Sequence, residues 1–226
     1  MRYFHEQLQD VLKQITIMGS LTESMITLAM RMLVERDESL ADEIYRKEDE
    51  VNALQVSIDD TAIGLIATQQ PVGKDVRFLF MTSKIVTDLE RIADQAKNIC
   101  QNAQFVLAQP PLKPMVDLPI MAEIAQKMVR DALTAVIDRD VALAERIMQE
   151  ESKVDAFRDQ VFRTLLTYMM ADPGTIQRAL SLILISRNIE RIGDHATNIA
   201  EEAIYIVQGR DIRHTEAPKP IPQGAA

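Results

Sequence analysis

The sequence has few of the residues that build disulfides, turns and aromatic cores. Among its 226 residues there are one cysteine, no tryptophan, seven glycines and 4% aromatic residues. One cysteine excludes an intrachain disulfide, which fits a reducing compartment. Long helices need few turns, and leucine, isoleucine, alanine and methionine can fill their cores. We therefore expect an all-α protein in which Cys100 is a small core residue.

The sequence also lacks common enzyme motifs and any excess of positive charge. It has no Gly-x-Ser-x-Gly, no glycine-rich phosphate loop and no clustered His–Cys pair. Acidic residues number 34 against 25 basic ones, for a formal net charge of −9. This charge disfavours non-specific binding to nucleic acid or to anionic lipid. Solubility alone can explain the acidity, so the net charge by itself predicts no ligand.

Long hydrophobic runs are missing as well. The first ten residues contain no apolar signal core. The most apolar run, Ala179 to Ser186, is too short to span a bilayer. We therefore expect a cytoplasmic protein.

Breaker residues divide the chain into long stretches with helical apolar periodicity. They form four groups, which are Gln70 to Gly73, Pro110 to Pro114, Asp172 to Thr175, and the segment after Gly209. The stretches before Pro71 and Pro173 are too long for single helices in a compact bundle. We predict helix breaks at Arg36-Asp37 and Arg139-Asp140, with aspartate as the N-cap.

The two halves of the chain repeat each other in three blocks of the same order. The blocks begin at Arg36 and Arg139, at Glu48 and Glu151, and at Leu89 and Ile189. The predicted fold is therefore all-α, with two tandem pseudo-symmetric three-helix bundles. We place the first bundle at residues 1–109, the second at 115–209, and a flexible tail at 210–226.

Apolar residues of the third helix in each half mark a packing seam. They step alternately by four and three, through Ile85, Leu89, Ile92, Ala96 and Ile99, and again through Ile185, Ile189, Ile192, Ala196 and Ile199. This spacing is typical of left-handed bundle packing, with helices crossing at about 20°. Methionines such as Met25, Met128 and Met170 are interpreted as core filler.

Each third helix also carries a pair of carboxylates beside its seam. Glu90 and Asp94, like Glu190 and Asp194, are four residues apart, which stacks them on one helix face. Arg91 does not share that face, because neighbouring residues point about 100° apart. One such pair is best explained as a solvated acidic surface. Its occurrence in both halves favours a functional site.

The second helix of each half adds further carboxylates. Glu48 and Glu151 occupy positions where the apolar spacing calls for a seam residue, and a buried carboxylate is costly unless it is hydrogen-bonded, paired or metal-bound. Asn52 and Asp155, four residues on, extend each group. A lysine or arginine partner at the bundle edge is one explanation. The other is a metal site, with ligands drawn from Glu48, Glu90, Asp94, Glu151, Asp155, Glu190 and Asp194.

An all-oxygen site suits hard or borderline ions such as magnesium, manganese, calcium or iron. The Glu-x-x-His pairs of di-iron bundles are missing, and His195 lies one residue off the Asp194 face. A metal-storage or oxidase bundle therefore stays a secondary interpretation. A helical scaffold whose acidic faces bind nothing is the third.

The chain resembles the PhoU family of phosphate transport system accessory proteins. The resemblance rests on two copies of its Leu-Glu-Arg-Ile-Gly-Asp motif, here Leu89 to Asp94 and Ile189 to Asp194. Ala93 replaces the usual glycine, but both carboxylate positions are kept. Pro71 to Arg77 matches the family's Pro-x-x-x-Asp-Leu-Arg segment, and the second half departs from it. The resemblance covers nearly the whole chain before the tail.

The resemblance implies a non-enzymatic cytoplasmic regulator of phosphate uptake and of the phosphate-starvation response. Its implied partners are the ATPase of the phosphate ABC transporter, a PhoR-type sensor histidine kinase and a second copy of the chain. Some family members bind multinuclear metal clusters through the motif carboxylates. We accordingly expect iron, manganese, magnesium or zinc at the seven carboxylates named above.

Overall fold

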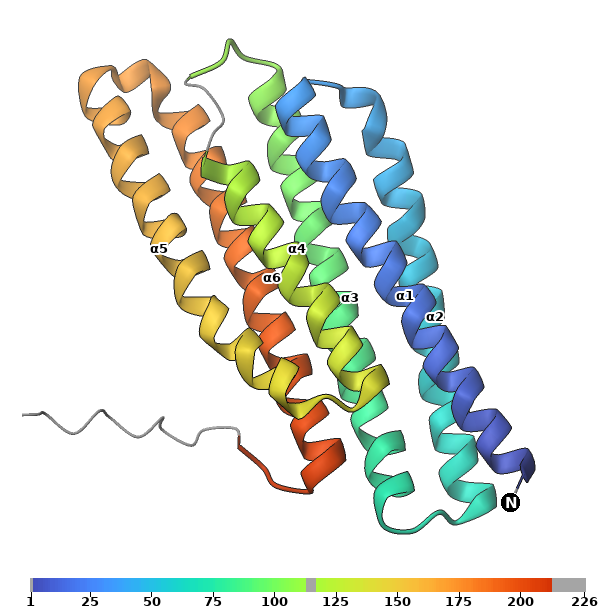
Figure 1. Cartoon of the computed structure of the whole chain (residues 1–226). Coiled ribbons are helices and arrows are strands. Elements are labelled where there is room, and N and C mark those ends of the chain that lie inside the picture. Colours follow the sequence, from blue (N-terminus) through green and yellow to red (C-terminus); the bar gives the residue numbers. More distant parts are fainter. Residues whose placement is uncertain (1, 113–116, 213–226) are drawn as a thin grey trace, which may run out of the picture.

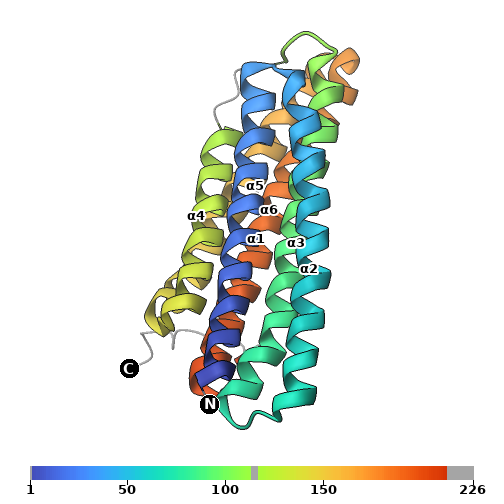
Figure 2. The ribbon, with the colours of Figure 1, turned by 90° about the vertical axis from the view of Figure 1, so that its right-hand side faces the viewer.

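The computed structural model describes residues 2–112 and 117–212. Within these residues the chain forms six long α-helices and two short 3₁₀ turns, with no strand. The first half holds α1 (Arg2–Glu35), η1 (Glu38–Leu40), α2 (Ala41–Gln69) and α3 (Lys74–Leu107). The second holds α4 (Asp117–Asp138), α5 (Val141–Ala171), η2 (Pro173–Thr175) and α6 (Ile176–Gln208). All six helices run along one long axis, and the start of α1 and the end of α6 lie at the same end (Figures 1 and 2).

Both predicted helix breaks are confirmed. Arg36 and Arg139 have positive φ angles of 58° and 57°, and the next residue caps the following helical turn. Asp37 accepts a hydrogen bond from the Ser39 backbone N–H, and Asp140 accepts one from Leu143 N–H. In each case the aspartate N–H also bonds to the carbonyl five residues back, which is the Schellman arrangement of a helix C-terminus. The two halves thus turn at equivalent positions by the same backbone geometry.

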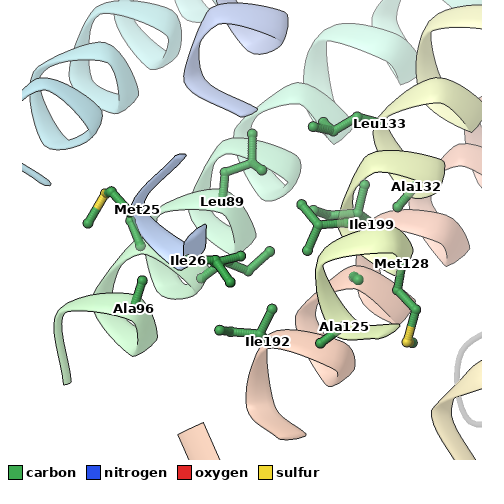
Figure 3. Packing of buried hydrophobic residues seen from close by; sticks show 14 of the residues in the cluster. Met25, Ile26, Leu89, Ala96, Ala125, Met128, Ala132, Leu133, Ile192 and Ile199 are labelled. Carbon is green, nitrogen blue, oxygen red and sulfur yellow. The ribbon is translucent and has the colours of Figure 1, made fainter. Parts of the chain in front are cut away.

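The third helices, α3 and α6, form the most extensive contact between two helices. They lie side by side and run in opposite directions at the centre of the molecule (Figure 1). The seam residues Leu89, Ile92, Ile192 and Ile199 are fully buried, and Figure 3 shows them among side chains of α1 and α4. The two predicted bundles therefore share one continuous hydrophobic core rather than packing as separate units.

Core composition follows the prediction, with one exception. Cys100 is fully buried, and its Sγ lies 3.5 Å from the Sδ of Met32. Met25 and Met128 are buried. The prediction for Met170 was wrong, since its side chain is 79% exposed on the last turn of α5. It lies on the same outward face as the exposed Phe162 and Leu166, whereas the neighbouring Met169 packs against the core.

Helix α1 is the one described helix with the length and composition of a membrane span. Its most apolar window has a mean hydropathy of 1.3, and 56% of that window is buried inside the fold. A core helix meets the same criteria. Most of the segment predicted as a flexible tail, residues 213–226, lies outside the described residues.

Candidate functional site

The predicted carboxylates form two groups, one in each half. The N-terminal cluster comprises Glu48 of α2 with Glu90 and Asp94 of α3. The C-terminal cluster comprises Glu151 and Asp155 of α5 with Glu190 and Asp194 of α6. Within each cluster the carboxylates are close enough to perturb one another, because Asp94 and Glu48 both raise the pKa of Glu90, after the larger effect of its burial. The repeat therefore places carboxylates at equivalent positions in both halves.

In the N-terminal cluster, Glu48 occupies the buried seam position that its spacing predicts. It is only 7% exposed. Its Oε1 accepts a hydrogen bond from Asn52 Nδ2 at 2.9 Å and lies 3.0 Å from Lys97 Nζ. Lys97 follows Asp94 by three residues, on the same side of α3. The carboxylate thus has the lysine partner that was one explanation for a charge at a seam.

Arg91 lies closer to the motif carboxylates than its position one residue from Glu90 suggested. Its Nε is 3.6 Å from Glu90 Oε2, and its Nη1 is 3.7 Å from Asp94 Oδ2. The expectation that Arg91 would stand apart considered only the Cα–Cβ direction, and the long side chain reaches back across the helix. Because Arg91 is 56% exposed, these ion pairs contribute little stability.

In the C-terminal cluster, one arginine joins the two helices. Arg158 Nη1 is ion-paired with Glu190 across the α5–α6 contact and lies 3.1 Å from Asp155 Oδ1. Arg158 Nη2 also lies 3.0 Å from Asp159. Arg158 is seven residues after Glu151, which places it on the same face of α5. The sequence reading missed both Arg158 and Lys97, although their i+3 spacing from Asp155 and Asp94 was a signal for them.

Asp194 is the most perturbed carboxyl of the C-terminal cluster. Its pKa is raised to about 6, chiefly by burial and further by the nearby charges of Glu190, Glu151 and Asp155. Among the described residues, no lysine, arginine or histidine nitrogen lies within 4 Å of Asp194 or Glu151. A raised carboxyl pKa at a polar pocket is a common property of functional sites.

Asp194 and Glu151 open onto a pocket of about 590 Å³ between α3, α5 and α6. The residues that line it are polar or charged, and include Ser83, Lys84, Thr87, Asp88, Thr197, Asn198, Glu201 and Glu202. Thr197 is 8% exposed, and its Oγ1 has no hydrogen-bond partner in the described structure. Lys84 Nζ lies 3.3 Å from Glu202 Oε1 and ties α3 to α6 at one side of the pocket.

His195 does not join the carboxylate cluster. Its Nδ1 lies 2.8 Å from Asp88 Oδ1 on α3, which also accepts a hydrogen bond from Asn198 Nδ2 at 3.1 Å. His195 therefore bridges the two halves of the molecule. This pairing leaves the clusters with oxygen donors alone, a set suited to hard cations.

The metal prediction itself remains a prediction. Among the described residues, no three Asp, Glu, His or Cys side chains stand close enough together to hold an ion, so binding would require some of these side chains to move. Arg158 and Lys97 already neutralise part of each cluster. The oxygen donors suit a hard ion. Glu151 and Asp194 suit it best, because they line the pocket and, within the described part of the chain, have no basic partner within 4 Å.

Taken together, the fold and the motifs define a class of helical proteins built from two tandem three-helix repeats, each with an acidic pair on its third helix. A PhoU domain matches the chain twice, at residues 15–103 and 118–203. The chain belongs to the PhoU family.

Two curated relatives and one solved structure illustrate the similarity. The phosphate-specific transport system accessory protein PhoU homolog of Pseudomonas aeruginosa is 37% identical over 212 residues, covering 93% of this chain and 88% of the relative. The Escherichia coli K12 accessory protein PhoU is 35% identical over 211 residues, with the same coverage of 93% and 88%. The crystal structure of PhoU from Pseudomonas aeruginosa superposes with a TM-score of 0.88 at 36% identity, covering 92% of this chain and all of that one.

Proposed function

We propose that this protein is a cytoplasmic regulatory adaptor of phosphate homeostasis. It holds down phosphate uptake and the phosphate-starvation response when phosphate is plentiful, by binding the ATPase of the phosphate ABC transporter and a PhoR-type sensor histidine kinase. The observation that carries this proposal is membership of the PhoU family over both repeats. The relatives are named as accessory proteins of phosphate-specific transport.

The proposed activity is binding rather than catalysis. The strongest charge pairs of the clusters are ion pairs that hold helices together, such as Arg158 with Glu190. An adaptor also needs apolar side chains at its surface. The α5–α6 hairpin has a stripe of them at four-residue spacing, Phe162, Leu166 and Met170 on α5 and Ile176, Leu180 and Leu184 on α6, all exposed.

Deleting the gene in its host tests the regulatory role. Cells grown in excess phosphate should then take up phosphate faster and express starvation genes, and a plasmid copy should reverse both changes. In parallel, the purified protein should capture the transporter ATPase and the cytoplasmic part of the sensor kinase, with the bare matrix as control. Unchanged repression together with no capture of either partner would refute the adaptor function. Light scattering of the same preparation checks the expected homodimer.

We further propose that the carboxylate clusters bind a hard or borderline metal ion, of which iron, manganese, magnesium and zinc are the candidates. The all-oxygen donor set and the unpaired hydroxyl of Thr197 support this. When bound, such an ion would supply positive charge between α5 and α6, with Glu151 and Asp194 as its ligands. The storage or oxidase alternative rests on the same carboxylates, but the clusters supply no histidine ligand, because Nδ1 of His195 lies against Asp88.

Elemental analysis of protein purified without added metal tests this second proposal. The double variant Glu151→Gln with Asp194→Asn should lose the metal. The control Glu145→Gln with Asp138→Asn makes the same change of charge at exposed positions and should keep it. A melting temperature that EDTA lowers in the wild type but not in the first variant would link the ion to the α5–α6 packing.

A further inference from the structure

The two clusters differ at one equivalent position of the third helices. In the first repeat this position is Lys97, and in the second, by the alignment of the two motifs, it is Thr197. Lys97 Nζ lies 3.0 Å from the buried carboxylate of Glu48. Thr197 makes no hydrogen bond to Glu151, the equivalent of Glu48, because its Oγ1 is left without a partner at 8% exposure. The first repeat thus contains a cation where the second contains an unpaired oxygen.

The helix-two residues strengthen the contrast. Asn52 donates a hydrogen bond to Glu48, whereas the equivalent residue of the second repeat, Asp155, is another carboxylate. Among the described residues, the three carboxylates of the N-terminal cluster face two cations within 4 Å, Lys97 and Arg91. The four carboxylates of the C-terminal cluster face one, Arg158. The C-terminal cluster therefore keeps an excess of negative charge. In the N-terminal cluster, Lys97 and Arg91 neutralise most of it.

The uncompensated carboxylates are also the accessible ones. Glu151 and Asp194 line the same pocket as Thr197, whose buried hydroxyl has no partner in the described structure. The lysine in that lining, Lys84, lies 3.3 Å from Glu202 Oε1 and forms no ion pair with Glu151 or Asp194. Glu48, by contrast, is buried against Lys97 and Asn52. An ammonium group and a metal ion compete for the same carboxylate oxygens, and they repel each other at short range. An ion could enter the N-terminal cluster only by displacing Lys97 from a buried partner.

We infer that the two repeats are not equivalent toward metal, and that Lys97 acts as a built-in counter-ion which confines metal binding to the C-terminal cluster. This inference rests on the proposed metal binding and specifies where it occurs. Both repeats carry the Glu-x-x-x-Asp motif, so the motif alone does not decide whether a repeat binds an ion. The residue at position 97 or 197 decides it. Lys97 is a specificity-determining residue in this sense, because it selects between the two clusters without being a ligand.

The reciprocal exchange of the two residues tests the inference, with Mn²⁺ as the probe. Wild-type protein should bind Mn²⁺ at one cluster, measured by equilibrium dialysis with elemental analysis. Thr197→Lys should weaken that binding at least tenfold. Lys97→Thr should add a second class of sites, and the double exchange should move binding to the first repeat. Lys97→Arg is the matched control, because it keeps the positive charge and should create no second site.

The position of the bound Mn²⁺ can also be measured in the wild-type protein. This matters if Lys97→Thr prevents folding by leaving the buried Glu48 carboxylate without its cation. Paramagnetic Mn²⁺ should broaden the backbone amide signals around Thr197 and Glu151 and leave those around Lys97 and Glu48 sharp. Equal broadening at both clusters, or two equal Mn²⁺ sites in the wild type, would overturn the inference while leaving the metal proposal intact. No Mn²⁺ binding by the wild type or by any variant would overturn both, and the adaptor function would be unaffected.

Discussion

The Nδ1 atom of His195 on α6 lies 2.8 Å from Oδ1 of Asp88 on α3, and this contact joins the two repeats across their central packing. Asp88 also accepts a hydrogen bond from Asn198. We predict that Asp88→Ala and His195→Ala each reduce the free energy of unfolding by about 1 kcal/mol, because each leaves a partly buried polar partner unsatisfied. Urea denaturation at pH 7.5 measures both effects.

The two substitutions should not be additive. The double variant should lose less than the sum of the single losses, with a coupling energy on the order of 0.5–1.5 kcal/mol. Strict additivity would mean that the contact between Asp88 and His195 contributes nothing to stability.

Asp194 should destabilise the metal-free protein at neutral pH. Its pKa is raised from an ordinary value of 3.8 to about 6, so the folded state binds the proton more tightly than the unfolded state. Stability therefore increases as pH falls from about 6 toward 3.8, and the full penalty is present above pH 6. Asp194→Asn should stabilise the protein by about 1–2 kcal/mol at pH 7.5, a value reduced for the partial exposure of the group.

The effect of Asp194→Asn should become small at pH 3.5, where the carboxyl is protonated in the folded state and mostly protonated in the unfolded state. Thermal melts in EDTA at the two pH values measure it. Glu190→Gln is the opposite control, because it removes the partner of Arg158 and should lower stability at pH 7.5. A loss of stability in Asp194→Asn at pH 7.5 would contradict the predicted direction.

Gly193→Ala should stabilise the protein. This glycine lies inside α6, and a Cβ added there would meet Val154 and Met128 at 3.7 and 3.8 Å, which is ordinary van der Waals contact. Replacing a glycine within a helix by alanine gains about 0.5–1 kcal/mol. The first repeat already has Ala93 at the equivalent position, fully buried, so the departure from the family motif is accommodated by the packing.

Gly19→Ala is the variant to compare with Gly193→Ala in a measurement of stability. A Cβ at Gly19 would lie 2.2 Å from Cδ1 of Leu133, so the leucine would have to move within the contact between α1 and α4. Guanidinium denaturation should therefore show a gain for Gly193→Ala and a smaller gain or a loss for Gly19→Ala. The reverse order would indicate that the helix packing around Gly193 is tighter than described.

Arg139→Gly should also raise stability, by up to about 1 kcal/mol. Arg139 has a φ of 57°, a left-handed conformation that costs a non-glycine residue free energy and that glycine adopts readily. Arg36 has the same conformation, but its Nη2 donates hydrogen bonds of 2.7 Å to the carbonyls of Leu107 and Gln109. Arg36→Gly should therefore gain less or lose stability, and differential scanning calorimetry of the two variants compares them.

The helices and their breaks could be predicted from sequence because their signals are local. Apolar spacing identified the seam of α3 and α6, and aspartate caps after Arg36 and Arg139 marked the turns. The shared core was not predicted, because the pattern of one helix does not say which other helix covers it. The outcome for Met170 has the same origin, since its exposure depends on which face of α5 the neighbouring helices cover.

The sequence predicted the two groups of carboxylates. It did not predict the basic side chains that pair with them. Glu48 was identified by its position in an apolar stripe, where a charge is unexpected. Lys97 and Arg158 lie three residues after Asp94 and Asp155, but this spacing also occurs between solvated side chains, so it did not distinguish them as structural partners. The bridge from His195 to Asp88 joins residues 107 positions apart, a relation that no spacing rule contains.

The antiparallel contact of α3 with α6 has the geometry of a subunit interface enclosed within one chain. Each half presents the buried stripe of its third helix to the other half, as two identical subunits would across a twofold axis. A half expressed alone, such as residues 1–109, would expose Leu89 and Ile92 to water. It should therefore assemble with a second copy of itself rather than remain monomeric, with α3 taking the place of α6.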